Sequence, residues 1–255
     1  MIIAGFNQAI GMAEVASEHG DMVDHFLEMV HWVMGILFIG WTTFLIFVLL
    51  RFNKKANPKA RYEGMTSHFS THVEIGVVIV EVVLLLGFAF PLWAARTEGI
   101  PTGDDVVKIR AVGEQFRWTF HYAGSDGKMG LTDFTQVNPS NGIGLVKQDP
   151  NAQDDFISLG ELIIPLGQKV IVQVTSKDVI HGLAPIPLMT QQDAIPGREI
   201  PMWFTATKTG EWDVVCAQLC GAGHANMVSS VKVMPKEEFD EWLAGQTPMF
   251  PPAAQ

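Results

Sequence analysis

Cysteine and basic charge are both scarce in this sequence, and each shortage excludes a class of protein. The 255 residues include 2 cysteines, and 17 lysines and arginines stand against 27 aspartates and glutamates, for a net charge of −10. Two cysteines are too few for a disulfide-stabilised scaffold, so their role depends on their neighbours. So acidic a chain is a poor partner for nucleic acid, whose phosphates attract lysine and arginine. We therefore expect no nucleic-acid partner.

Several signature motifs are also missing. The sequence has no G-x-G-x-x-G, no phosphate-binding loop and no alternation of helices with strands, so a nucleotide-binding fold is not expected. It has no Cys-x-x-Cys-His either, so we expect no haem-bearing electron-donor domain within this chain.

The apolar residues are concentrated in two runs near the N-terminus. Residues 33–50 carry no charge, and residues 75–95 carry only Glu81. Each run approaches the ~20 residues needed to cross a hydrocarbon core of ~30 Å. We therefore expect an anchor domain over residues 1–96, with membrane-spanning helices at about 30–51 and 73–95. The first run is too long, begins too late and has too acidic a flank for a cleavable signal peptide.

The loop between the runs predicts the orientation. Its positive charges are Arg51, Lys54, Lys55, Lys59 and Arg61. Short loops rich in lysine and arginine stay in the cytoplasm, so both termini should lie on the opposite side, in a bacterial periplasm or a mitochondrial intermembrane space.

Two carboxylates in the second expected helix, at about 73–95, suggest a membrane partner. Glu74 and Glu81 are seven residues apart and so share one helix face. An ionisable group as deep as Glu81 is costly unless it faces protein or water. We expect the hairpin to pack against a larger membrane subunit.

Residues 97–255 have the pattern of an all-β domain. Short segments with alternating or β-branched residues, such as 106–112, 115–122 and 169–176, are separated by glycine, proline and aspartate. This predicts a sandwich or barrel. A polar excursion is expected at 123–159 and a short helix at 235–245. The domain carries 11 basic and 19 acidic residues, a balance of −8 that either keeps it soluble or steers a basic partner.

A cluster of soft ligands is the most informative segment. Cys216, Cys220, His224 and Met227 fall within twelve residues, and His181 follows an expected strand. Thiolate, imidazole and thioether together suit copper. The two cysteines alone could form a disulfide, zinc seldom uses methionine, and a one-copper site leaves one thiol unused. Two copper ions bridged by two thiolates account for all five groups.

With this cluster of ligands, the chain resembles subunit II of the haem–copper cytochrome c oxidases. The resemblance rests on Cys-x3-Cys-Gly-x2-His-x2-Met, preceded by Asp-Val-Ile-His-Gly and Asp-Ala-Ile-Pro-Gly-Arg, and covers nearly the whole chain. It implies a two-helix transmembrane hairpin followed by a cupredoxin-like Greek-key sandwich holding a two-copper Cu-A centre. The ligands it implies are Cys216 and Cys220 as bridges, His181, His224, Met227 as a weak ligand, and the backbone carbonyl of Gln218.

The resemblance also implies partners and further roles. Electrons would come from cytochrome c or a membrane-bound cytochrome and pass to haem in subunit I, where oxygen reduction is coupled to proton pumping; a subunit III is also expected. Glu74 corresponds to a proton-channel entrance. Asp178 and Asp193 resemble parts of a cytochrome c docking face, and Arg198 resembles a contact towards the haem propionates.

Two departures from the family pattern stand out. Gln218 occupies the position of a glutamate that helps bind magnesium or manganese at the subunit interface, and a neutral amide is a poorer ligand for a hard cation. Phe116 replaces the usual electron-accepting tryptophan, with the unusual Arg117 beside it. Trp118 remains as an alternative entry point, although a strand-core role is the simpler interpretation.

Other protein classes explain fewer residues. Quinol oxidase subunits lack the copper ligands, and nitrous oxide reductase has a large propeller that this chain does not contain. A Sco-type copper chaperone would have proline where Gly221 stands, together with a thioredoxin fold. A non-redox anchor with a structural disulfide leaves His181, His224 and Met227 as coincidences.

Overall fold

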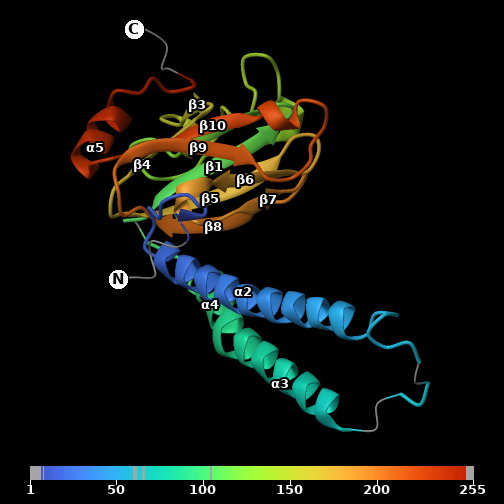
Figure 1. The fold of residues 1–255 in the computed structure, drawn as a ribbon. Helices are drawn as coiled ribbons and strands as arrows, with labels where there is room; N and C mark the ends of the chain where they lie inside the picture. The colour runs from blue at the N-terminus through green and yellow to red at the C-terminus, as the bar shows by residue number, and fades with distance from the viewer. Residues whose placement is uncertain (1–6, 8, 60–61, 65–66, 104, 251–255) are drawn as a thin grey trace, which may run out of the picture. The chain divides into compact units, whose positions relative to one another are not determined.

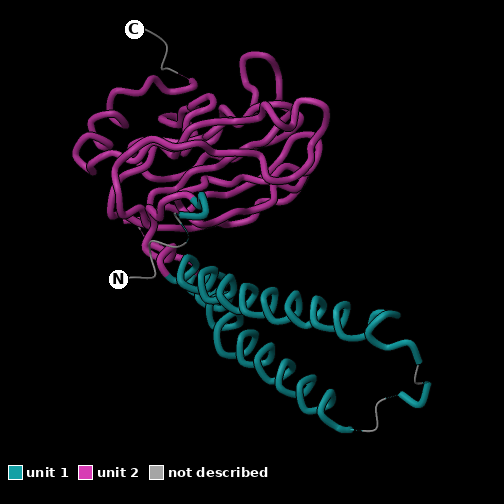
Figure 2. Tube along the Cα trace, viewed as in Figure 1, with its two compact units in different colours: residues 1–12, 22–99 teal, residues 13–21, 100–255 magenta. Residues whose placement is uncertain are grey.

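The computed structural model describes residues 7, 9–59, 62–64, 67–103 and 105–250. Its contacts divide the chain into two units (Figure 2): residues 1–12 with 22–99, and residues 13–21 with 100–255. Arg61, one of the basic residues used to predict orientation, lies outside the described residues.

The first unit contains two long helical stretches (Figure 1). Helix α2 (Gly20–Arg51) begins well before the predicted span, and α3 (Phe69–Leu84) continues through the π-helical turn η1 (Leu85–Ala89) into α4 (Phe90–Thr97). Both stretches are long and apolar enough to cross a membrane. The π-helical turn ends two residues before Pro91, whose ring has no N–H to donate and would clash with the carbonyl of Gly87 in a regular α-helix.

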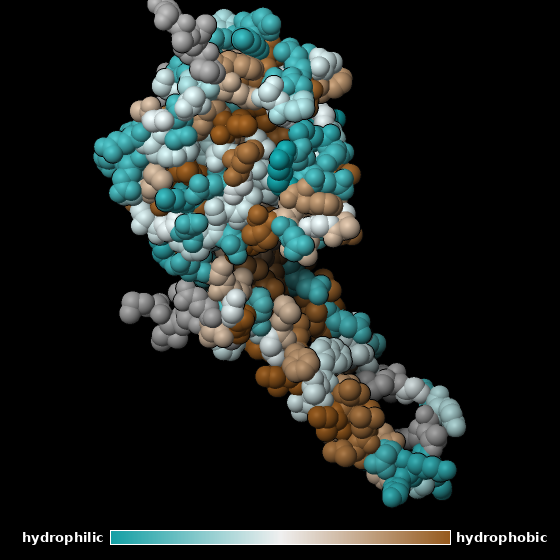
Figure 3. All heavy atoms as spheres, turned by 90° about the horizontal axis from the view of Figure 1, so that it is seen from above, coloured by the Kyte–Doolittle hydropathy of each residue, from teal (hydrophilic) through white to brown (hydrophobic). Residues whose placement is uncertain are grey.

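The helices of the first unit expose apolar side chains along much of their length (Figure 3). A helix that is apolar on all sides requires lipid or another apolar partner around it. This agrees with the predicted membrane hairpin.

The second unit is a β-sandwich, which confirms the predicted fold class (Figure 1). One sheet has the order β3-β2-β1-β5-β8 and the other has the order β4-β10-β9-β6-β7. The strands are β1 (Val107–Glu114), β2 (Arg117–Tyr122), β3 (Phe156–Leu159), β4 (Glu161–Pro165), β5 (Lys169–Ser176), β6 (His181–Pro185), β7 (Gln192–Ala194), β8 (Ile200–Thr205), β9 (Gly210–Cys216) and β10 (Val228–Met234). Helix α5 (Lys236–Ala244) is the predicted C-terminal helix.

Alternation along the strands builds the core between the sheets. In β5, Val170, Val172 and Val174 are all fully buried, as expected when every second side chain faces the same layer. The phenol of Tyr122 donates a hydrogen bond to the carbonyl of Ile163 on the opposite sheet at 2.9 Å. This hydrogen bond crosses the apolar core that lies between the two sheets.

A buried polar chain fastens the long excursion to the first sheet. Arg110 Nη1 donates to His121 Nδ1 at 3.0 Å, and His121 Nε2 donates to Asp155 Oδ2 at 2.7 Å. The same carboxylate oxygen accepts the backbone N–H of Gly130 at 2.8 Å. Burial lowers the pKa of His121 despite the neighbouring Asp155, so the imidazole is neutral and its donor and acceptor nitrogens are both fixed.

Residues 13–21 pack into the β unit although they lie before α2 or at its start. The backbone N–H of Ala16 donates to Pro187 O at 2.8 Å, and Thr207 N–H donates to Ala16 O at 2.9 Å. The Ala16 side chain belongs to the core cluster, and Ser17 Oγ donates to Leu188 O at 2.7 Å. The division predicted at residue 97 stays a prediction, and the contacts add this segment to the β unit.

We predict that Ala16→Leu destabilises the β unit. A larger side chain at a fully buried position costs about 1–3 kcal/mol through overpacking, which should lower the thermal unfolding midpoint by several degrees. The matched control is Ala244→Leu, at an exposed position of α5. The measurement is near-UV circular dichroism of the full-length chain in detergent. Equal midpoints for the two variants would contradict the packing of this segment.

Candidate metal centre

Strand register brings the first two candidate ligands together. In the antiparallel pair β6–β9, Leu183 lies opposite Cys216, and Ala217 N–H donates to Gly182 O at 2.9 Å. His181, two residues before Leu183, therefore lies beside the chain that leaves β9. A Cβ added to Gly182 would lie 3.0 Å from the backbone nitrogen of Gln218, so glycine allows this close approach.

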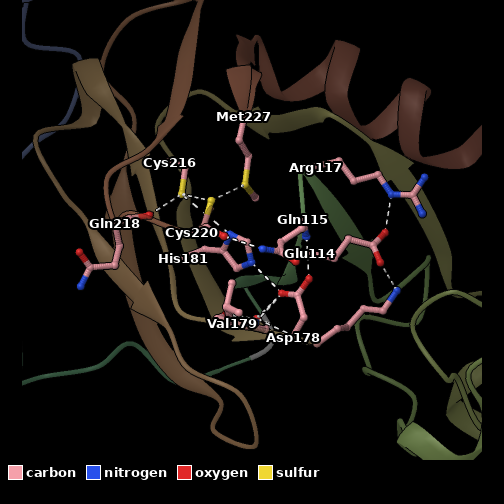
Figure 4. A network of polar contacts seen from close by, with 12 residues as sticks. Glu114, Gln115, Arg117, Asp178, Val179, His181, Cys216, Gln218, Cys220 and Met227 are labelled. Atoms are coloured by element: carbon pink, nitrogen blue, oxygen red, sulfur yellow. Dashed lines mark hydrogen bonds and ion pairs between the residues drawn. The ribbon is translucent and has the colours of Figure 1, made fainter. Parts of the chain in front are cut away.

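The loop between β9 and β10 supplies the remaining candidates (Figure 4). Cys220 Sγ lies 3.8 Å from Cys216 Sγ, 3.7 Å from His224 Nδ1 and 3.8 Å from Met227 Sδ. Cys216 Sγ lies 3.9 Å from His181 Nδ1. The thiol of Cys216 also donates to the carbonyl of Gln218 at 3.2 Å. All six predicted ligands are thus gathered around the two sulfurs.

These separations fit shared metal ligands. Two donor atoms on one four-coordinate metal at ~2.0–2.3 Å lie roughly 3.5–3.8 Å apart. A disulfide would need about 2.05 Å between the sulfurs, and both cysteines are free thiols. The nitrogen of His181 and the two sulfurs lie within 4.8 Å of one another. The donor set therefore suits a soft metal such as copper.

Burial makes the site a low-dielectric one. The side chains of His181, Cys216, Cys220 and Met227 are all buried. Burial raises the pKa of Cys220 to about 11, and the adjacent Cys216 adds to the rise. The thiol keeps its proton at neutral pH until a metal displaces it.

Asp178 orients His181 from behind. Its Oδ1 accepts a hydrogen bond from His181 Nε2 at 2.8 Å, which leaves Nδ1 directed at Cys216. Burial would raise the pKa of Asp178, but hydrogen bonds from His181, Gln115 and Val179 hold it below its ordinary value. A carboxylate behind a ligating histidine fixes the ring and makes it a stronger ligand. The predicted docking residue thus directs a carboxylate oxygen at a candidate ligand.

The β1–β2 turn lies against the metal-binding loop. Phe116 is 39% exposed, and a Cβ added to Gly223 would lie 2.4 Å from its Cδ2 atom. Glu114 pairs with both Arg117 and Lys177 (Figure 4). The positive charge of Arg117, which departs from the family pattern, is therefore balanced locally.

Trp118 lies on strand β2, directly after this turn, with its side chain in the core. It is fully buried, and its ring centroid lies 5.9 Å from that of His181 in an edge-on arrangement. Its position is that of a core side chain packed against a candidate ligand.

No contact with the two sulfurs is seen for the remaining predicted residues, within the part of the chain that the structure describes. Glu74 is on α3, and Asp193 on β7 accepts a hydrogen bond from Gln191 Nε2 at 2.8 Å. Arg198 is exposed and lines a hollow of about 560 Å³ on the outer face of the first sheet. Arg110 in this hollow pairs with Glu199 at 2.8 Å. The hollow contains none of the predicted metal ligands.

Gln115 was not singled out from the sequence. Its hydrogen-bond partners are 63 and 105 residues away, so no local pattern indicates them. A polar residue beside the aromatic stretch was the only available signal.

Fold and site together define a class of protein. A two-helix hairpin suited to a membrane precedes a cupredoxin-like sandwich, and the sandwich holds a buried thiol, imidazole and thioether cluster. The class they define is a cupredoxin-like domain with a candidate site for a soft metal, preceded by two helices that could cross a membrane.

Comparison with known proteins identifies the family. Residues 107–234 match the family model for the periplasmic domain of cytochrome c oxidase subunit II. The chain is 31% identical over 237 residues to cytochrome c oxidase subunit 2 of Cereibacter sphaeroides, covering 84% of this chain and 75% of that one. It is 29% identical over 225 residues to the alternative cytochrome c oxidase subunit 2 of Bradyrhizobium diazoefficiens, covering 88% and 80%.

A solved structure is also similar. The crystal structure of the periplasmic domain of cytochrome oxidase subunit II from Bradyrhizobium japonicum is 32% identical, covers 57% of this chain and 95% of its own, and gives a TM-score of 0.42.

The chain belongs to the cytochrome c oxidase subunit II family. It is therefore an oxidoreductase component of a haem–copper oxidase complex, with subunit I as its partner and copper binding as a family property. This confirms the family that the sequence resemblance implied.

We predict that Asp178→Asn weakens copper binding. The substitution removes the negative charge behind His181. It also replaces one acceptor oxygen by an amide NH₂, which cannot accept the hydrogen bonds that the carboxylate receives now. Loss of such a supporting partner costs 10–100-fold in metal affinity, and we expect about 10-fold. Chelator competition on the full-length chain measures it, with Asp213→Asn on the exposed face of β9 as the control. An unchanged affinity would show that Asp178 does not support the ligand.

Proposed function

We propose that this subunit carries a binuclear Cu-A centre and transfers electrons from a cytochrome to haem in subunit I. The proposed ligands are His181, His224, Cys216, Cys220, Met227 and the carbonyl of Gln218. The observation that carries the proposal is the pairing of each thiol with a different imidazole. Cys216 neighbours His181 at 3.9 Å, and Cys220 neighbours His224 at 3.7 Å.

This pairing supports two metals rather than one. A single ion would draw both imidazoles to a common point, whereas here they lie beside separate sulfurs that are 3.8 Å apart. Two copper ions held by Cys216, Cys220 and the two imidazoles would supply a one-electron centre at this position. The chain itself contributes a rigid frame, because its ligands come from β6, the end of β9 and the loop that leads into β10.

The protein groups around the site hold its geometry and exclude water. Asp178 fixes the His181 ring, and Trp118 packs edge-on against it. Rigid ligands and a buried shell keep reorganisation small and set the reduction potential. Nothing in this proposal requires an open position for substrate, so oxygen reduction belongs to subunit I.

We propose that the donor docks around Phe116. The partly exposed ring contacts the metal-binding loop, so a bound cytochrome would come close to the centre. Partial burial would raise the pKa of Glu114, but hydrogen bonds from Lys177 and Arg117 hold it below its ordinary value. Glu114 is thus paired with Arg117 and Lys177, and Asp178 is paired with His181, which favours a donor that binds largely through apolar contact. Asp193 remains a proposed contact with the donor, and Arg198 remains a proposed contact with subunit I.

The membrane arrangement is part of the same proposal. Both termini and the β unit would lie on the periplasmic or intermembrane side of a bacterial or mitochondrial inner membrane, as the basic loop indicates. Glu74 would mark the entrance of a proton channel into subunit I, and subunit III would complete the oxidase. Gln218 exposes a neutral side chain, so we propose no magnesium or manganese ligand there.

The alternative functions account for less of the structure. A Sco-type chaperone would have a thioredoxin fold, whereas this chain folds as a β-sandwich. A non-redox anchor would use a disulfide, whereas the cysteines are free thiols.

We predict two copper ions per chain and a seven-line EPR spectrum from one electron shared by two nuclei. The sample is the full-length chain, because residues 13–21 contribute to the core. Cys220→Ser should abolish the paired centre. Met227→Leu should keep both coppers but alter the spectrum. Met202→Leu, at another buried methionine, should leave the spectrum unchanged. One copper with a four-line signal, or a metal-free disulfide, would refute the proposal.

We also predict that Phe116→Ala slows electron entry. Loss of the ring removes apolar contact with the donor, so the bimolecular rate of reduction should fall about 10-fold for a loss of ~1.4 kcal/mol of contact energy. Stopped-flow reduction by a cytochrome c measures the rate. Phe134→Ala, at a phenylalanine that is 86% exposed elsewhere on the unit, is the control. Equal rates for both variants would place the docking site elsewhere.

A further inference from the structure

Gln115 makes two hydrogen bonds into the metal site from different atoms (Figure 4). Its side-chain Nε2 donates to the carbonyl of Cys220 at 2.7 Å. Its backbone N–H donates to Asp178 Oδ2 at 2.7 Å. One residue of the β1–β2 turn therefore reaches both a proposed bridging thiol and the carboxylate behind His181.

The contact with Cys220 fixes the loop where it carries a proposed ligand. The carbonyl that accepts the bond belongs to the same residue as the Sγ atom, so its position constrains the sulfur. Directly after it, Gly221 has φ +136°, and a Cβ there would lie 2.7 Å from Gln115 Nε2. Glycine at this position leaves space for the glutamine amide.

The contact with Asp178 acts on the opposite part of the ligand set. The carboxylate shares its two oxygens between the N–H of Gln115 and the imidazole of His181. A shift of the turn would therefore move the group that sets the orientation of this ring. Gln115 links the two parts of the site, which lie on separate segments of the chain.

The side-chain contact is chemically specific. A carbonyl acceptor needs a donor, and the amide of glutamine supplies one without adding charge. A glutamate of the same shape would present a carboxylate to the carbonyl and lose the bond, whereas a lysine would keep an N–H donor of similar reach. Because Gln115 is exposed, these substitutions are not expected to disturb the core.

We infer that Gln115 is a positioning residue of the metal centre, holding Cys220 through its side chain and His181 through Asp178. The inference rests on the proposed Cu-A function. It assigns to the β1–β2 turn, beside the docking residue Phe116, a direct role in setting the geometry and reduction potential of the centre.

The test compares Gln115→Glu, Gln115→Leu and Gln115→Lys in the full-length, copper-loaded chain. The matched controls are Gln168→Glu and Gln168→Leu, because Gln168 Nε2 also donates to a backbone carbonyl at 2.7 Å, that of Asp105. The readouts are copper loss to a chelator, the EPR hyperfine pattern and the reduction potential. Thermal unfolding before copper loading reports any general loss of stability.

We expect Gln115→Glu and Gln115→Leu to lose copper about 10-fold faster, at the lower end of the range for supporting residues. Both should alter the hyperfine pattern and lower the potential, more so for glutamate, whose negative charge favours the oxidised centre. Gln115→Lys should restore copper retention, and the Gln168 variants should match the wild type. Unfolding before loading should be unchanged throughout.

Each contrary outcome has a distinct meaning. A wild-type chain without two coppers would refute the proposed function itself. A normal wild type with Gln115→Glu and Gln115→Leu equal to their Gln168 controls would refute the positioning role. A Gln115→Lys variant as impaired as Gln115→Leu would refute the donor hydrogen bond as its basis.

Discussion

The antiparallel pairing of β6 with β9 is the constraint on which the metal centre depends. It places Leu183 opposite Cys216 and so carries His181 past the strand end to the loop that holds the second thiol. A slip of one residue would turn every side chain of β6 to the other face and separate the imidazole from the sulfurs. The buried apolar residues of both strands oppose such a slip, so the hydrophobic core also determines the positions of the ligands.

The site has an inner side that is apolar and an outer side that is polar. Inside, Trp118 and Met227 surround the sulfurs with buried side chains. Outside, Asp178 and Gln115 connect the ligands to the surface turn through hydrogen bonds. The inner side excludes water from the ligands. The outer side couples the buried ligands to the exposed turn, so a movement of the turn would move them.

Much of this arrangement could be predicted from the sequence because the signals were local. The two helical stretches, the strands that became β1, β2 and β5, and the ligand motif around Cys216 are continuous patterns of residues. Strands β3, β4, β6 and β7 were not predicted, because each is short and shows little alternation between apolar and polar residues. Strand β3 lies at the end of the stretch 123–159 that was expected to be a polar excursion, so that expectation is wrong for residues 156–159. The contacts of Gln115 were not predictable, because they depend on how distant strands pair. The packing of residues 13–21 has no sequence period, and only small side chains such as Ala16 hint at a close approach.

The contacts of residues 13–21 have a consequence for how the chain matures. Ala16 bonds to Thr207, so an early segment closes against one made nearly two hundred residues later. Contacts of such long sequence separation form slowly. The backbone partners of Ala16 are Pro187 and Thr207, so a growing chain that has made residues 13–21 holds a segment without its place in the sandwich. The segment can join the β unit only after most of the strands have been made, and the core is completed late in synthesis.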